Sequence, residues 1–167
     1  MRLIVYHVNQ DDPKKCTARK MERFGLAKIV RKVDRIPRKA IILNPFARIP
    51  FSRLDREISS RFGIAAIDCS WKEVERAFSK LSRFPNQRSL PFLIPVNPIN
   101  FGRPSKLSTL EAFIACLYII GEDQLVERLS GLYKWSPHFL EINRELLDTY
   151  RNSKNPEEIL EKLERFF

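Results

Sequence analysis

The sequence has few of the residues from which several common sites are built, since only 5 glycines and 2 histidines occur among 167 residues. No glycine-rich phosphate loop or dinucleotide fingerprint is present, so the chain lacks the loops that a nucleoside triphosphate usually needs. The cysteines Cys16, Cys69 and Cys116 form no C-x-x-C pair, and neither His7 nor His138 lies near two cysteines in the sequence. A zinc site is therefore not expected, and the sequence predicts a protein without a bound metal.

Long hydrophobic runs are also missing. No run reaches the roughly 18 residues that a membrane helix needs. Residues 1–8 are too short, and too soon followed by charge, to form a signal peptide. Hydrophobic residues nevertheless make up 44% of the chain, which is enough for a core. We therefore expect a soluble, cytoplasmic protein of a reducing compartment that does not bind membranes.

Positive charge is in excess. The formal net charge is +10 at pH 7, and the isoelectric point is about 9.8. Such a charge predicts attraction to a polyanion, of which nucleic acid is the commonest. Charge alone leaves the partner open, because many basic proteins never bind nucleic acid.

Apolar periodicity predicts alternating strands and helices in the first part of the chain. Runs typical of buried strands occupy residues 3–8, 27–33, 40–43, 64–67 and 90–96, and helical spacing occupies 14–24, 52–62 and 71–81. Only helices are predicted beyond the last strand, at 108–121, 123–133, 137–150 and 156–166. This order predicts an α/β fold with a mostly parallel sheet and an all-helical C-terminal extension. We expect one compact unit with an N-terminal half, residues 1–85, and a C-terminal half, residues 86–167.

Four loops that follow predicted strands contain unusual residues, at 11–17, 44–45, 68–71 and 97–105. Ligands of open α/β sheets bind at the carboxyl ends of the strands. Any one of these loops is more simply an ordinary turn, but four together favour a ligand site at one edge of the sheet.

Three kinds of side chain are candidates for chemistry in these loops. Asp68 ends an apolar strand, where partial desolvation raises the proton affinity of a carboxylate and suits it to general-base catalysis. A helix-capping role for Asp68 is equally consistent, although Ser70 already fits that role. Thr17 and Thr109 each lie in the first turn of a helix, where they either bind an anion such as a carboxylate or serve their own backbone. Trp71 either lines a pocket or anchors its helix, and the sequence favours the anchor.

Basic side chains in or beside the same loops predict a phosphate-binding surface, provided that the loops converge. These are Lys14, Lys15, Arg19, Lys20, Arg48, Arg53, Arg56, Arg103 and Lys106. The mixed charges of residues 157–165 are instead typical of solvated helices.

Three segments resemble a known family. They are DDPKKCTARK at residues 11–20, IDCSW at 67–71, and LPFLIPVNPINFGRPSKLSTLEAFIACLYIIG at 90–121, with a looser match in WSPHFLEIN at 135–143. Together they resemble the small-subunit ribosomal RNA aminocarboxypropyltransferases over nearly the whole chain, in a compact archaeal form. The segment at 90–121 is the most specific of them.

The resemblance implies a SPOUT-like, trefoil-knotted fold that binds S-adenosylmethionine as co-substrate. It also implies transfer of the 3-amino-3-carboxypropyl group to N3 of a modified uridine, N1-methylpseudouridine in the well-known case, with release of methylthioadenosine. The implied partner is small-subunit rRNA or a pre-ribosomal particle. Extra C-terminal helices would cover the usual SPOUT dimer surface, so we expect a monomer. The alternatives are a SPOUT-type RNA methyltransferase and a ribosome-assembly RNA-binding protein without catalysis.

The resemblance also assigns residues by position. It implies that Thr17 and Thr109 hold the donor carboxylate, that Asp68 takes the N3 proton, and that Trp71 shields the methyl group. The backbone at Ile67 would bond the ribose. The adenine and the rest of the donor would be bracketed by Leu43, Pro45, Leu90 and the backbone around Ser105. The basic residues named above would hold the RNA backbone, with the target base flipped out.

Overall fold

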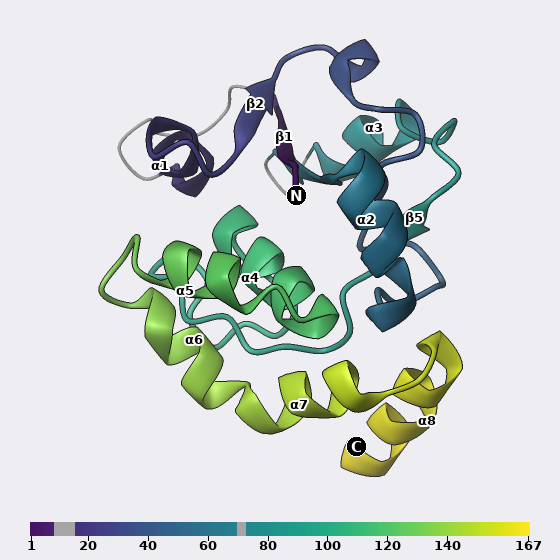
Figure 1. Ribbon diagram of the computed structural model, residues 1–167, viewed down its shortest axis with the longest axis vertical. Helices are drawn as coiled ribbons and strands as arrows, with labels where there is room; N and C mark the ends of the chain where they lie inside the picture. The colour runs from purple at the N-terminus through teal and green to yellow at the C-terminus, as the bar shows by residue number, and fades with distance from the viewer. Residues whose placement is uncertain (9–15, 70–72) are drawn as a thin grey trace.

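The computed structural model describes residues 1–8, 16–69 and 73–167 and places five strands in one sheet (Figure 1). The strands are β1 (Leu3–His7), β2 (Lys28–Val30), β3 (Ile41–Leu43), β4 (Ile64–Asp68) and β5 (Gln87–Arg88). Every neighbouring pair is parallel, and the strand order is β2-β1-β4-β3-β5. The predicted α/β class and the predicted parallel sheet are therefore confirmed.

Helices connect the strands and then form the rest of the chain. They are α1 (Thr17–Arg23), α2 (Arg56–Phe62), α3 (Val74–Ser79), α4 (Thr109–Ile120), α5 (Asp123–Ser130), α6 (Ser136–Ile142), α7 (Arg144–Asn152) and α8 (Pro156–Phe166), with short 3₁₀ helices η1 (Val33–Arg35) and η2 (Arg53–Asp55). Beyond residue 96 only helices follow in the described residues, as the sequence predicted. No helix of the described residues is both long enough and apolar enough to cross a membrane.

Two apolar cores cover the two faces of the sheet, because side chains alternate along each strand. Leu3 and Val5 of β1 face the larger core, which also contains residues of α1 and α4. Ile4 and Tyr6 face a smaller core that includes residues of α3. The larger core joins residues from both 1–85 and 86–167. The division of the chain at residue 85 stays a prediction.

Helix α4 lies at the centre of the larger core, and nine of its 12 residues are buried. Ser108 caps its first turn by accepting a hydrogen bond from the backbone of Glu111 at 3.2 Å, and Gly121 ends it with a φ of 80°. Helices α5 and α7 pack against α4, and Figure 1 shows α5 to α8 as an arc around it, away from β1 and β2. A helix that is apolar on nearly all sides belongs in such a position.

Residues 90–96, which were predicted as the last strand, form no strand. Side chains from the C-terminal helices form hydrogen bonds with backbone N–H and carbonyl groups of this segment that would otherwise pair with a neighbouring strand. Asn143 accepts a hydrogen bond from the N–H of Ile94 and donates one to its carbonyl, both at 2.8 Å. The carboxylate of Glu111 accepts a hydrogen bond from the N–H of Val96 at 2.7 Å. The segment is therefore a loop held by side chains. The helix predicted at 137–150 is also divided, into α6 and α7, at the buried Asn143.

The SPOUT-like, trefoil-knotted fold implied by the resemblance is wrong for this structure. The chain shows a five-stranded parallel α/β sheet followed by packed helices. The predicted last strand, at 90–96, is instead a loop, because buried polar side chains satisfy its backbone. The sequence correctly predicted the loop at 97–105 and the helix after it, but neither the loop at 90–96 nor the topology of the chain around them.

Candidate active site

The carboxyl ends of the strands meet at one edge of the sheet, because all neighbouring strands are parallel. His7 and Asp68 are the last residues of β1 and β4 and lie opposite one another in the strand register. Leu43 and Arg88 end β3 and β5 as a second such pair. The structure thus brings together the ends of β1, β3 and β4, after which three of the four unusual loops follow, whereas the fourth loop, at 97–105, follows no strand. Residues 9–15 and 70–72, which continue the chain after β1 and β4, lie outside the described residues.

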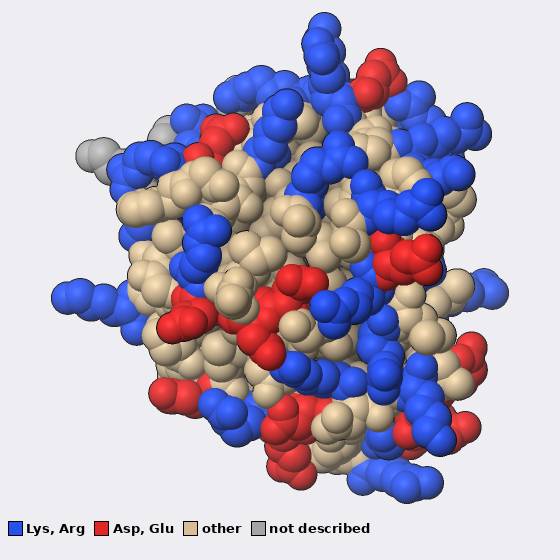
Figure 2. Space-filling model, in the orientation of Figure 1, with Lys and Arg blue, Asp and Glu red and all other residues tan. Residues whose placement is uncertain are grey.

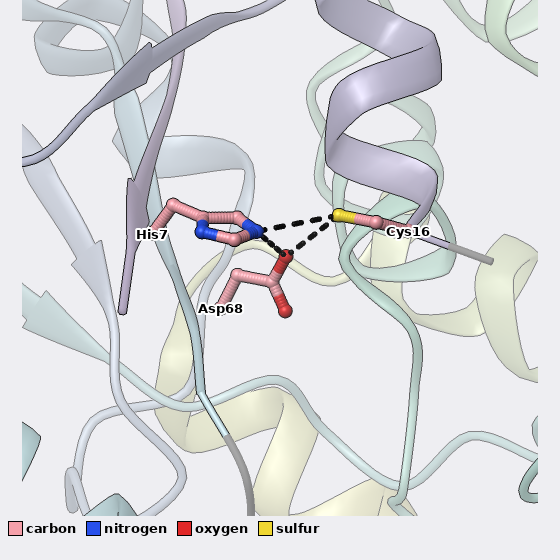
Figure 3. A group of neighbouring side chains, drawn as sticks. All are labelled: His7, Cys16 and Asp68. Atoms are coloured by element: carbon pink, nitrogen blue, oxygen red, sulfur yellow. Dashed lines mark hydrogen bonds and ion pairs between the residues drawn. The ribbon is translucent and has the colours of Figure 1, made fainter. Parts of the chain in front are cut away.

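A cluster of three side chains stands at this edge (Figure 3). Cys16 Sγ lies 3.5 Å from His7 Nε2 and donates a hydrogen bond to Asp68 Oδ2 at 3.3 Å. His7 Nε2 is 3.6 Å from the same carboxylate oxygen. Strand alternation explains the convergence, since His7 lies on the same face as Val5, and Asp68 on the same face as Ala66, toward the larger core. Cys16 is the residue directly before α1, and its sulfur lies on that same face.

Burial makes the Cys16 thiol a weaker acid. Burial, with a further contribution from the negative charge of Asp68, raises the pKa of the Cys16 thiol to about 11. At neutral pH the sulfur therefore keeps its proton and donates it to the Asp68 carboxylate. Among the described residues, Asp68 contacts Cys16 and His7. The capping alternative for Asp68 involves residues 70–72, which lie outside the described residues, so it stays open.

The two threonines assigned to the donor carboxylate begin neighbouring helices. Thr17 is the first residue of α1 and Thr109 the first of α4, and these helices pack against one another. Ser108 supplies the cap of α4, so the hydroxyl of Thr109 is not needed for that role. Both threonines are half-buried. Their binding of a carboxylate stays a prediction.

The other residues assigned to the donor lie around the same strand ends. Leu43 is buried at the end of β3, Pro45 is exposed just after it, and Leu90 is half-buried against the larger core. Ile67 belongs to the smaller core, on the sheet face opposite to Asp68, which fits a backbone contact better than one from its side chain. Ser105 has a φ of 63°, and its N–H donates to the carbonyl of Leu93 at 3.1 Å. The residue Trp71 lies outside the described residues.

Sequence reasoning missed a second role of Glu111. This residue completes the capping box of α4, but its side chain is fully buried and also holds the preceding loop. Oε1 accepts from the N–H groups of Val96 and Asn97 at 2.7 and 2.9 Å. Oε2 accepts from Asn97 Nδ2 and from the N–H of Ser108 at 2.7 and 2.8 Å. The available signal was a carboxylate in an otherwise apolar helix, since a buried charge needs several donors.

Positive charge is concentrated in the α/β half. Residues 1–85 contain 20 of the 30 Lys and Arg residues but only 9 of the 20 Asp and Glu residues. Figure 2 shows Lys and Arg gathered mostly over the upper part of this face, where the sheet half lies, with mixed charge below. The predicted polyanion-binding surface is therefore best sought on the α/β half.

Individual basic residues differ in their surroundings. Lys20 Nζ lies 4.0 Å from the ring centroid of Tyr133. Arg56 donates to the carbonyl of Ile120 at 2.9 Å, at the end of α4 opposite to Thr109, so part of its role is to close that helix. Arg53 and Arg103 are exposed, Arg19 and Lys106 are half-exposed, and Lys14 and Lys15 lie outside the described residues. Contact of these residues with RNA stays a prediction.

Two surface hollows lie away from the strand ends. One, of about 540 Å³, lies between α7 and α8, and the other, of about 310 Å³, lies beside β1 and β2. Neither is lined by the predicted donor residues. The chemistry of the described residues therefore points to the strand ends.

Comparison with known proteins defines the class of this protein first. Residues 41–167 match the family described as "Ribosome biogenesis protein, C-terminal". The chain is 48% identical over 160 residues to the 16S rRNA aminocarboxypropyltransferase of Methanocaldococcus jannaschii, covering 96% of this chain and 92% of that one. It is 45% identical over 166 residues to the 16S rRNA aminocarboxypropyltransferase of Methanothermobacter thermautotrophicus, covering 99% and 98%. The chain therefore belongs to the 16S rRNA aminocarboxypropyltransferase family.

A solved structure agrees with this assignment. The SAM-dependent rRNA:acp-transferase Tsr3 from Vulcanisaeta distributa matches with a TM-score of 0.88 and 39% identity, over 97% of this chain and 88% of that one. Residues 1–35 also match a family described as "Possible Fer4-like domain in RNase L inhibitor". Iron–sulfur clusters are held mainly by sets of cysteine thiolates, whereas residues 1–35 contain Cys16 alone. The residues of this segment do not fit such a cluster.

Proposed function

We propose that this chain transfers the 3-amino-3-carboxypropyl group of S-adenosylmethionine to N3 of a pseudouridine, or of its N1-methyl derivative, in small-subunit rRNA. The observation that carries this proposal is the similarity to 16S rRNA aminocarboxypropyltransferases over almost the full chain. The SAM-dependent relative of known structure supports the choice of donor.

The reaction moves one carbon chain from sulfur to nitrogen. N3 gives up its proton and attacks the methylene carbon next to the sulfonium sulfur, and the N–C bond forms as the S–C bond breaks. The sulfur leaves as the neutral thioether of methylthioadenosine. Three carbons of the sulfonium are open to attack, so orientation alone selects the group that moves. Because the sulfur sheds its positive charge on leaving, we infer that the transfer needs no metal.

Asp68 is the proposed base that takes the N3 proton. Its position at the carboxyl end of β4 supports this role, since its side chain is only 14% exposed yet still reaches solvent. The hydrogen bond from Cys16 and the neighbouring His7 hold the carboxylate in one place. Thr17 and Thr109 are proposed to bind the donor carboxylate, because their helices pack together on the same side of the sheet.

The remaining donor contacts are proposed to come mainly from backbone. Glu111 and Ser105 belong to the network that fixes the loop at 92–105, which suits a surface that brackets adenine. Leu43, Pro45, Leu90 and the backbone of Ile67 complete this proposal, with Trp71 shielding the methyl group. We further propose a cytoplasmic monomer whose basic α/β half holds the RNA backbone while the target base is flipped out.

The test combines product analysis with one substitution. Purified protein, small-subunit rRNA and S-adenosylmethionine should yield methylthioadenosine and the modified nucleoside, both detected by mass spectrometry. Release of S-adenosylhomocysteine would show a methyltransferase instead, and absence of donor binding in calorimetry would leave only an RNA-binding protein.

Asp68→Asn should keep donor affinity but slow transfer by about 10²–10⁴-fold, the usual contribution of a general base. Asp34→Asn is the matched control, because Asp34 is exposed and pairs only with a surface arginine among the contacts described here. Equal transfer rates for the two variants would refute the assignment of Asp68 as the base.

A further inference from the structure

Three atoms of the kinds that bind transition metals converge at the sheet edge from three separate elements. They are His7 Nε2 at the end of β1, Cys16 Sγ before α1, and Asp68 Oδ2 at the end of β4, and all lie within 4.8 Å of one another (Figure 3). We propose that these atoms form a binding site for a divalent transition-metal ion of the Zn²⁺ class.

The spacing of the three atoms fits a tetrahedral ion. With usual zinc bonds to sulfur, nitrogen and oxygen, tetrahedral angles place the ligand atoms about 3.3–3.6 Å apart. The observed separations are 3.5 Å for sulfur to nitrogen, 3.3 Å for sulfur to oxygen and 3.6 Å for nitrogen to oxygen. An ion can therefore be placed among them with shifts of a few tenths of an ångström.

The donor set selects the kind of metal. One thiolate, one imidazole and one carboxylate suit Zn²⁺ and its close relatives, whereas Mg²⁺ and Ca²⁺ prefer oxygen ligands alone. Three protein ligands leave a fourth position open, which is the arrangement of catalytic rather than structural zinc sites. His7 and Cys16 are nearly fully buried, and the partly exposed carboxylate of Asp68 provides the route by which an ion enters.

The backbone already holds the ligands in place. His7 and Asp68 are register partners on adjacent parallel strands, so their relative position is set by the sheet. Cys16 is fixed by α1, whose Ala18 and Met21 are fully buried in the larger core. On binding, the Cys16 thiol gives its proton to solvent as the sulfur becomes a thiolate ligand.

Sequence spacing did not reveal this site. Cys16 is separated from His7 by 9 positions and from Asp68 by 52, so no compact metal motif exists. The prediction of no zinc site rested on the absence of paired cysteines, which is a criterion for structural sites built from local motifs.

One consequence of the site rests on the proposed function. Coordination of an ion by Asp68 lowers the proton affinity of its carboxylate, which is the proposed base, so a bound ion should inhibit transfer rather than promote it. The site would then make the enzyme sensitive to free zinc.

The direct test is a Co²⁺ titration of the full-length, metal-free protein, followed by absorbance. Cobalt in place of zinc gives a thiolate-to-metal charge-transfer band in the near ultraviolet, and we expect it to saturate at one ion per chain and to disappear when Zn²⁺ is added. Cys16→Ser should abolish the band. Cys69→Ser should retain it, because Cys69 is not part of the cluster.

A second variant keeps the test independent of the packing of Cys16. His7→Gln retains every cysteine and should weaken Co²⁺ binding by more than about 100-fold, since even indirect supporting partners of metal ligands typically contribute 10–100-fold. Circular dichroism of each variant verifies folding. The optical titration uses neither donor nor rRNA, so its failure leaves the proposed transfer reaction untouched.

Three outcomes would overturn the site. They are the absence of a thiolate band in the wild-type protein, loss of the band in Cys69→Ser but not in Cys16→Ser, and unchanged Co²⁺ affinity in His7→Gln. Any of them would show that the three side chains form only a hydrogen-bonded cluster. In a separate arm, transfer that continues at saturating Co²⁺ would overturn the use of the Asp68 carboxylate both as metal ligand and as base.

Discussion

Replacing Glu111 by glutamine should destabilise the protein strongly, although the two side chains have nearly the same shape. All four partners of the carboxylate are N–H donors, two on each oxygen. An amide offers one oxygen and one NH₂ group, so in either orientation two donors face another donor. Two of the four hydrogen bonds are lost, and the remaining two no longer reach a charged acceptor.

The size of the effect follows from the number of bonds. A hydrogen bond to a charged group contributes about 1.5–3 kcal/mol, so losing two costs about 3–6 kcal/mol. Burying a neutral amide costs less than burying a carboxylate, which offsets part of this loss. We expect a net loss of about 3 kcal/mol, which for a chain of this length lowers Tm by about 6–12 °C.

Chemical denaturation followed by circular dichroism measures this loss as a lower midpoint at an unchanged m value. Glu161→Gln is the matched control, because Glu161 is exposed on α8 and the same chemical change there should cost less than about 0.5 kcal/mol. Donor affinity should fall together with stability in Glu111→Gln, since the carboxylate holds the loop proposed to bracket adenine. A loss of less than about 1 kcal/mol would refute the four-donor interpretation.

Three further predictions follow from the same structure. Asn143→Leu leaves both backbone groups of Ile94 without their partner and should cost about 2–5 kcal/mol in urea denaturation; a cost below about 1 kcal/mol would contradict it. The pKa of the Cys16 thiol is raised from 9.0 to about 11, so its stabilising contribution is complete below pH 9 and is lost as pH rises toward 11. Cys16→Ser should remove this loss of unfolding free energy at alkaline pH, which is at most about 3 kcal/mol, when unfolding is measured with a chelator present. If the variant and the wild-type protein lose the same stability between pH 9 and 11, titration of Cys16 is excluded as the cause. Arg103→Ala should reduce the slope of log binding constant against log salt concentration for rRNA by about one unit, without changing Tm. The control Arg165→Ala, on α8, should change neither the slope nor Tm. Equal slopes for the two variants would exclude a phosphate contact at Arg103.

Much of the architecture could be predicted because it depends on local patterns. Strand-length apolar runs interrupted by helical spacing predicted a parallel sheet, and a parallel sheet places all carboxyl ends on one edge. The capping box at Ser108 correctly predicted the start of α4. These signals are short-range, so they survive without knowledge of what each segment packs against.

The errors share one physical cause. Residues 90–96 have the apolar composition of a strand, yet Asn143 and Glu111 satisfy their backbone groups from the far side of the core. Residues 137–150 have the composition of one helix, yet Asn143 divides it while bonding to Ile94. Partners so distant in sequence leave no periodic signal, and the resemblance could not correct them because it supplied a knotted topology that the structure does not show.

The sequence by itself determined the α/β class, the parallel sheet with its strand ends at one edge, the excess of positive charge and the kinship with rRNA aminocarboxypropyltransferases. These follow from local periodicity, composition and recognisable segments. Only the tertiary structure decided that His7, Cys16 and Asp68 meet within bonding distance, and that Glu111 anchors the loop before its own helix. Such contacts depend on strand register and on the packing of α1 and α4, which arise when distant segments fold together.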